Sequence, residues 1–333
     1  RLRLRGPMIE YYKTSHEVAA DGTKVPFTGR VDAPVRGCWI SVVAPTQEER
    51  RWMLEELHVN PEFVTSALDD EETSRVDLDA ETGQALVIVD CPFVEDEREA
   101  VDPSIVQYDT HPLAVLFLPE QDTIMTVSLK PNATVDAVAG GRIAGVNTAQ
   151  RTRLLLQMLL FISRRYQADL RSVNRQFREN ERKLRRSMRN ADLIKMLGFE
   201  KSLVYFSTSL KALDATVRRI GYGRTVRLYE DDRDLLDDVS IEIRQAIEMC
   251  GIYTEVFNET MDTFGSLINN NLNLTMRTLA IITLVLSMPT MVFSFYGMNT
   301  ALPLDEAWVF PLVLSIVLSV VAAVWIMRSR LIK

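Results

Sequence analysis

The sequence predicts an α+β membrane protein with an N-terminal α/β domain, a long helical stalk and two C-terminal transmembrane helices. Strand-like and helical patterns mix in the first part of the chain. After Asn147, apolar residues recur at three- and four-residue spacing, and no proline occurs before Pro289. Two long runs near the end, 278–304 and 307–327, contain no charged residue, and about 20 apolar residues suffice to span a bilayer.

The α/β domain is assigned to residues 8–145, with residues 1–7 set aside. A helix is expected at Thr46–Leu57, because Thr46 and Glu49 have the spacing of a capping box, and a shorter one at Pro61–Leu68. Strands are predicted where Val, Ile and aromatic residues gather. These are Cys38–Val43, Ala85–Val89, Ile105–Asp109, Leu113–Leu118 and Thr123–Ser128.

Long helices are expected in the rest of the chain. Residues 146–225 predict two antiparallel cytoplasmic helices, at about 147–187 and 191–220. A third, 226–298, is continuous with the first transmembrane helix and would be roughly 100 Å long at 1.5 Å per residue. The remaining parts are the span itself at about 278–298, an external loop 299–306, a second span 307–327 and a basic tail 328–333.

The charges around the spans predict the orientation. Arg277 precedes the first span and the basic tail follows the second, whereas the connector contains Asp305 and Glu306 and no Lys or Arg. Positive charges favour the cytoplasmic side. No apolar signal segment opens the sequence, so we expect a multi-pass protein of the cell (inner or plasma) membrane with both termini in the cytoplasm.

Other functional classes have little support in the residues. Cys38, Cys91 and Cys250 are scattered and predict three reduced core thiols, not a disulfide framework or a zinc site. No Walker-type glycine loop and no nucleophile–base constellation stands out. We therefore expect no enzymatic activity, no organic cofactor and no nucleic-acid partner.

Hydroxyl residues mark one face of the first span. Their spacings of four, three and four place them on one side of a helix. They are Thr283, Ser287, Thr290 and Ser294. The same face continues back through Leu279, Met276, Asn269 and Asp262. Small hydroxyl residues also let helices pack closely. Because this stripe leads to polar residues at both ends, we favour a pore wall, which needs several copies around a shared axis.

The outer end of the span carries Tyr296-Gly297-Met298-Asn299. Polar groups at such a position are expected to face water or an ion. A ring of Asn299 amide oxygens could hold Mg²⁺ through its tightly bound waters. Lower down, Met276 and Leu279 would form a hydrophobic constriction able to gate by dewetting.

Together these residues resemble the CorA magnesium transporter family of the two-span Gly-Met-Asn superfamily. The segment Asn269-Asn270-Asn271-Leu272-Asn273, and Pro289-Thr290 ahead of the motif, add to the resemblance, which covers nearly the whole chain. It implies a funnel-shaped homopentamer in the lipid bilayer, whose first spans line the pore. The transported ion would be Mg²⁺, with Co²⁺ or Ni²⁺ as further ions, and cytoplasmic Mg²⁺ would also regulate it.

The resemblance implies roles for individual residues. Asn299 would select the ion, Thr290, Ser287, Leu279 and Met276 would follow along the pore, and Asp262 would lie near its cytoplasmic vestibule. Asp238 matches one carboxylate of the regulatory site, and Glu242 lies one turn further on. The partner position is occupied by Ser66, with Asp69 and Asp70 just beyond. A solvated helix face would explain the acidic run 230–242 equally well.

Two alternatives remain at this point. A zinc transporter of the ZntB type would share the motif and the two spans. A membrane-anchored oligomeric scaffold would use its spans only as anchors, so that replacing Asn299 would leave its function intact.

Overall fold

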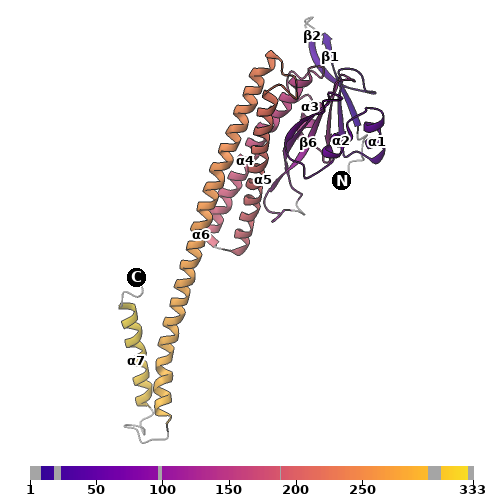
Figure 1. Ribbon diagram of the computed structural model, residues 1–333. Helices are drawn as coiled ribbons and strands as arrows, with labels where there is room; N and C mark the ends of the chain where they lie inside the picture. The colour runs from indigo at the N-terminus through magenta and orange to yellow at the C-terminus, as the bar shows by residue number, and fades with distance from the viewer. Residues whose placement is uncertain (1–8, 19–23, 97–99, 188, 299–308, 329–333) are drawn as a thin grey trace. The chain divides into compact units, whose positions relative to one another are not determined.

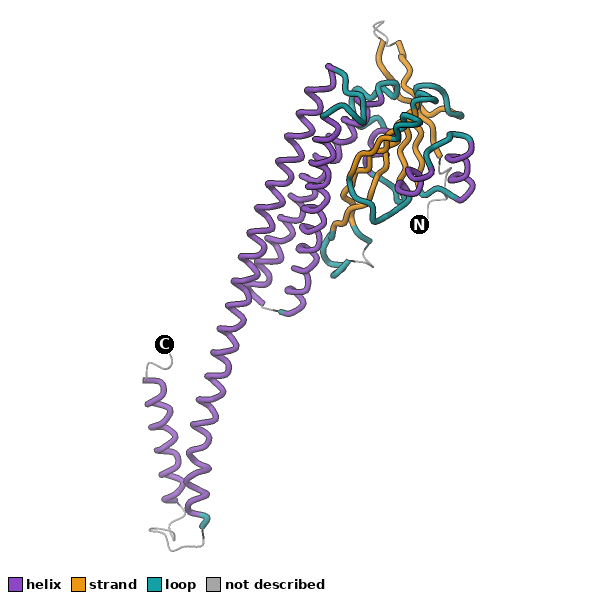
Figure 2. Tube along the Cα trace, in the orientation of Figure 1, coloured by secondary structure: helices purple, strands orange, loops and turns teal. Residues whose placement is uncertain are grey.

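The computed structural model describes residues 9–18, 24–96, 100–187, 189–298 and 309–328. It divides into two compact units, Arg1–Phe257 and Asn258–Lys333. Figure 1 labels the helices and strands, and Figure 2 distinguishes them by colour. Helix α6 (Arg233–Tyr296) begins in the first unit and ends in the second.

The first unit contains a seven-stranded sheet in the order β2-β1-β3-β7-β6-β5-β4. The strands are β1 (Ile9–Val18), β2 (Lys24–Val31), β3 (Trp39–Val43), β4 (Arg75–Leu78), β5 (Ala85–Val94), β6 (Tyr108–Leu118) and β7 (Thr123–Ser128). Only the β3–β7 pair is parallel among the described strands, with Trp39 opposite Ile124. All other neighbouring pairs are antiparallel.

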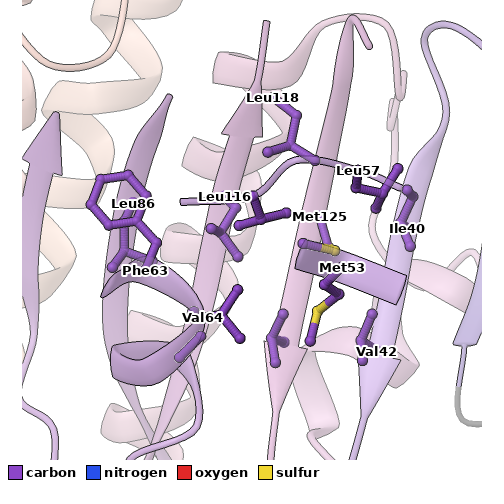
Figure 3. Packing of buried hydrophobic residues seen from close by; sticks show 14 of the residues in the cluster. Ile40, Val42, Met53, Leu57, Phe63, Val64, Leu86, Leu116, Leu118 and Met125 are labelled. Atoms are coloured by element: carbon purple, nitrogen blue, oxygen red, sulfur yellow. The ribbon is translucent and has the colours of Figure 1, made fainter. Parts of the chain in front are cut away.

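One face of this sheet packs against the short helices α1 (Gln47–Glu55) and α2 (Pro61–Ala67). The capping box predicted at Thr46 and Glu49 is present at the start of α1. Side chains of both helices enter a buried cluster with alternate residues of four strands (Figure 3). The cluster includes Met53, Leu57, Phe63, Val64, Ile40, Val42, Leu86, Leu116, Leu118 and Met125.

The opposite face of the sheet is covered by α4 (Arg151–Ser187) and α5 (Asn190–Gly221). The Tyr166 hydroxyl of α4 donates a hydrogen bond to the Asp90 carbonyl of β5 at 3.0 Å. The Phe206 ring of α5 meets the Tyr166 ring edge-on, with centroids 5.2 Å apart. Because side chains alternate between the faces of a strand, both faces of the central strands are buried and rich in apolar residues.

The predicted strand Ile105–Asp109 is wrong, because residues 105–107 lie in a loop and β6 is one strand through Pro112. The β7 ladder covers only Ala114–Leu118 of β6. Pro112 therefore has no β7 neighbour. Although proline lacks an N–H, the β6–β7 ladder loses no hydrogen bond at this position. Strands β1, β2 and β4 and helix α3 (Ala133–Ala139) were not predicted.

The long helices differ from prediction mainly at their starts. The third was expected from residue 226, but α6 begins at Arg233 after a 3₁₀ turn, η1 (Glu230–Asp232). Residues 226–229 are not helical. In the second unit, α6 and α7 (Val309–Arg328) each contain an 18-residue window of high mean hydropathy, 1.9 and 2.7. By length and composition, both helices can cross a membrane.

Candidate functional site

Helix α7 lies along one face of α6 in the second unit (Figure 1). Between residues 278 and 298, the α6 residues that are at least partly buried recur at spacings of four, three, one, three and four. They are Ile281, Val285, Met288, Pro289, Val292 and Tyr296. Met288, Val292 and Tyr296 border a groove shared with Leu314 and Leu318 of α7. This side of α6 is therefore its contact face with α7.

The hydroxyl stripe lies on the opposite side of α6. An α-helix turns by about 100° per residue, which places the centre of the stripe roughly 180° away from the centre of the contact face. All four hydroxyl residues are exposed. Met276 and Leu279 are 58% and 57% exposed, and Asn269 and Asp262 are exposed as well. Most of the predicted pore-lining residues thus lie on a face that the second span leaves uncovered, whereas Ser294 also borders the groove shared with α7.

The hydroxyl groups of this stripe are oriented by their own helix. Thr283 Oγ1 donates to the Leu279 carbonyl at 2.9 Å, and Ser287 Oγ donates to the Leu284 carbonyl at 2.7 Å. Thr290 Oγ1 donates likewise to the Leu286 carbonyl at 3.3 Å. Since these three hydroxyl protons are used within the helix, the oxygen lone pairs remain as acceptors. Acceptors without fixed charge suit the protons of an ion's hydration shell.

The motif begins where α6 ends. The Gly297 N–H donates to the Phe293 carbonyl at 2.9 Å, which closes the last turn. A Cβ at Gly297 would lie 3.2 Å from the Phe293 carbonyl oxygen, so a larger residue would crowd the helix end. Met298 is 56% exposed. Asn299, on which the predicted selectivity depends, lies outside the described residues, as do Asp305 and Glu306.

An aromatic contact beside the motif was not predicted from the sequence. The Tyr296 ring meets the Phe310 ring of α7 edge-on, with centroids 6.1 Å apart. The sequence signal that could have indicated this contact is Phe310, an aromatic residue near the start of the second apolar run. The contact joins the end of α6 to the beginning of α7.

The predicted regulatory residues on α6 fall into two environments. Asp238 is exposed, on the same side of α6 as Ile241 and Ile252, which are 56% and 57% exposed. Glu242 is engaged within its own chain instead. Its Oε1 accepts from Arg164 Nε at 3.2 Å, and its Oε2 accepts from Gln167 Nε2 at 2.6 Å. Asp238 is therefore available to a partner, whereas Glu242 already has two.

The residues predicted for the regulatory site at the end of α2 and just beyond it also have partners within their own chain. Asp69 Oδ1 accepts from the Glu71 N–H at 3.0 Å, and Asp70 pairs with Lys130 at 3.1 Å. Ser66 Oγ accepts from the Arg75 guanidinium at 2.9 Å. Within the described ranges, no group of three or more His, Cys, Asp or Glu side chains is arranged to hold a metal ion. One chain does not assemble the predicted regulatory site from these residues.

The cysteines are buried and free, as predicted. Burial raises the pKa of the Cys91 thiol to about 12 and that of Cys250 to about 11. Thiols with such pKa values remain protonated and unreactive at neutral pH.

The fold and this site define an α+β protein with two candidate membrane helices, the first of which carries a polar face and ends in Tyr-Gly-Met. The chain belongs to the CorA-like Mg²⁺ transporter family, whose model matches residues 36–328. That match covers strands β3 to β7 of the sheet, the long helices and both candidate spans.

Individual relatives agree with this assignment. The chain is 25% identical over 270 residues to the cobalt/magnesium transport protein CorA of Methanocaldococcus jannaschii, covering 78% of this chain and 79% of the relative. The complete structure of the CorA magnesium transporter from the same organism matches with a TM-score of 0.75 at 23% identity, over 98% of this chain and 99% of that one.

A further solved structure resembles the chain less closely. The cytoplasmic domain of ZntB from Vibrio parahaemolyticus matches with a TM-score of 0.56 at 14% identity, over 80% of this chain and 100% of that one. At this identity the likeness concerns the fold alone.

Proposed function

We propose that this chain forms a channel for divalent cations, Mg²⁺ foremost, that admits the ion into the cell down the membrane potential. Co²⁺ and Ni²⁺ are further candidate ions. The observation that carries the proposal is the hydroxyl stripe on the face of α6 opposite α7. If α6 merely anchored the protein, a lipid-facing surface would have no reason to collect hydroxyl groups at its centre.

The pore requires several copies of the chain, because two helices cannot enclose a water-filled path. Copies arranged around one axis would turn each stripe residue into a ring. Ile241 and Ile252 support such an assembly, since both are exposed on one side of α6 in the first unit. The family resemblance suggests a pentamer with the loop 299–306 outside and both termini in the cytoplasm.

The chemistry of the stripe suits a hydrated Mg²⁺ ion. Mg²⁺ gives up its waters reluctantly, so neutral acceptors that bind those waters can guide it without trapping it. Asn299 would add amide oxygens at the outer mouth, and Met276 and Leu279 a constriction on the cytoplasmic side. Moving two positive charges inward through about 100 mV releases about 4.6 kcal/mol, so no fuel site is needed.

Regulation by cytoplasmic Mg²⁺ is proposed to act between subunits through Asp238. This carboxylate is exposed beside Ile241, on the side of α6 that a neighbouring copy would cover. Asp69 and Asp70 are the candidates for the facing acids. Glu242, engaged by Arg164 and Gln167, would support the helix and not hold the ion directly.

A zinc transporter is the second candidate, favoured by the likeness to the ZntB cytoplasmic domain. Purified protein in liposomes containing a Mg²⁺ or a Zn²⁺ indicator, with and without a proton gradient, distinguishes the two. We expect Mg²⁺ entry that follows the membrane potential and needs no proton gradient. Zinc entry that depends on the proton gradient, with no Mg²⁺ entry, would replace the proposal by the second candidate.

The variant Asn299→Ala tests the pore itself. We expect loss of ion entry while the oligomer persists in size-exclusion chromatography. Unchanged entry would contradict the selectivity role of Asn299, and the absence of any ion entry by the unaltered protein would leave only the scaffold function.

A further inference from the structure

The first unit contains a cavity that the proposed ion pathway does not use. Its volume is about 520 Å³, and it lies where α4 begins, near the start of β5 and the end of β6. The residues relevant to its chemistry are Arg151, Thr152, Arg153, Arg227, Tyr229 and Asp231. Cavities of a few hundred cubic ångströms hold small organic ligands.

Three arginines line this cavity. Arg151 pairs with Asp122 at 2.9 Å, and Arg153 pairs with Asp232 at 3.1 Å. The Arg227 guanidinium lies 5.2 Å from the centre of the Tyr229 ring, and no described carboxylate is within salt-bridge distance of it. Each guanidinium has five N–H donors, so these contacts position the arginines and still leave donors for an anion.

The backbone adds a second source of positive potential. Helix α4 has 37 residues, and its first turn contains no acidic residue. The first N–H groups of a helix lack partners within it, and its dipole favours an anion at this end. Residues 151–153, the first of α4, carry these groups and belong to the cavity wall.

The loop carrying Arg227 is held against this helix start. Thr152 Oγ1 donates to the Arg227 carbonyl at 2.8 Å, and the Thr152 side chain is buried. Because the backbone makes this bond, the Arg227 side chain can be exchanged without breaking it. Tyr229 is 50% exposed and offers ring surface at the edge of the cavity.

We propose that this cavity binds a phosphate-bearing small molecule of the nucleotide class. Its phosphates would lie at the start of α4 among Arg151, Arg153 and Arg227, since arginine forks match phosphate oxygens in pairs. Its base would lie against Tyr229. Asp231 would face the sugar hydroxyls, for which a carboxylate is a suitable acceptor. This site is separate from the ion pathway and does not depend on it.

Equilibrium dialysis of the full-length protein in detergent with radiolabelled ATP tests the site, in Mg²⁺-free buffer so that ATP does not act by removing the ion. We expect saturable binding that inorganic pyrophosphate displaces and adenosine does not. Arg227→Glu should weaken ATP binding about tenfold or more, the effect of losing one charged hydrogen bond. Arg224→Glu, on the same segment but outside the cavity wall, should leave binding unchanged.

A second variant separates the two parts of the ligand. Tyr229→Ala should weaken ATP binding but leave pyrophosphate binding intact. Absence of saturable ATP binding below about 1 mM would overturn the proposal, as would equal losses in the Arg224 and Arg227 variants. Pyrophosphate binding as tight as ATP binding, with no effect of Tyr229→Ala, would overturn the nucleotide class. Thermal unfolding shows whether each variant is folded, and Arg227→Gln replaces Arg227→Glu if that one is not.

Discussion

The ring of Tyr296, the last residue of α6, meets the ring of Phe310, in the first turn of α7, edge to face with centroids 6.1 Å apart. The two residues flank the connector that carries Asn299. Their contact therefore joins the helix ends on both sides of the proposed pore entrance. The groove formed by Met288, Val292, Leu314 and Leu318 continues the same interface along the two helices.

Replacing Tyr296 should impair ion entry through the geometry of this entrance. Tyr296→Ala removes an edge-to-face pair of about 0.5–1.5 kcal/mol together with the buried ring area. We expect slower Mg²⁺ entry into liposomes and a lower unfolding temperature. Tyr296→Phe keeps the ring and should behave nearly as the unaltered protein. Equal entry rates for the Ala variant and the unaltered protein would show that this contact does not hold the entrance.

Cysteine accessibility can locate the water-facing side of α6. Thr290→Cys and Ser287→Cys should react with a membrane-impermeant thiol reagent in bilayers, because the stripe is expected to face water. Ile282→Cys and Leu284→Cys are matched controls, exposed in one chain but positioned on either side of the stripe, and should react slowly.

The native cysteines will contribute little background to this labelling, because all three are buried. Mass spectrometry of the labelled protein gives the extent of reaction at each site. If Ile282→Cys and Leu284→Cys react as fast as Thr290→Cys, the stripe does not line a pore.

Asp238 and Glu242 should differ when their charges are removed. Asp238→Asn should abolish the protection from proteolysis that Mg²⁺ confers, since its carboxylate is the exposed one. Glu242→Gln weakens the contacts to Arg164 and Gln167, so it should lower the unfolding temperature while the Mg²⁺ dependence persists. Limited proteolysis over a Mg²⁺ titration measures both. Unchanged Mg²⁺ dependence in Asp238→Asn would remove this residue from the regulatory site.

His111 should make the first unit less stable in acid. Burial lowers the pKa of His111 to about 4, and the charge of Lys130 contributes in the same direction. The unfolded chain, with an ordinary pKa of about 6.5, binds the proton first, so stability falls as the pH drops from about 6.5 towards 4. The slope is at most about 1.4 kcal/mol per pH unit.

The variant His111→Gln isolates this contribution. It cannot take up the proton, and its amide can still reach Asn132, which lies 3.1 Å from His111 Nε2. We expect a smaller loss of unfolding temperature between pH 7 and pH 5 than in the unaltered protein. Identical losses would show that another group causes the acid sensitivity.

Most of the strands with strong apolar patterns could be predicted, because both faces of the central sheet are buried. The edge hairpin β1–β2 could not be predicted, because most of its residues are polar. Its strands are defined by their pairing with each other and not by an apolar pattern. The separate strands expected at Ile105–Asp109 and Leu113–Leu118 were a local inference, and the β5 ladder overrules it because it pairs β6 without a break from Tyr108 to Phe117. The first residue of a helix was equally hard to predict from the sequence, as the 3₁₀ turn before α6 illustrates.

By itself, the sequence determined that the protein has two apolar spans, a long preceding helix, and hydroxyls at helical spacing on the first span. These features are periodic and local, so they can be identified from the spacing of residues along the chain. Only the tertiary structure decided which face of α6 packs against α7, and that this is the face opposite the hydroxyls. It also decided that Glu242 is engaged by Arg164 and Gln167 while Asp238 stays exposed, because such contacts join residues that lie far apart in the chain.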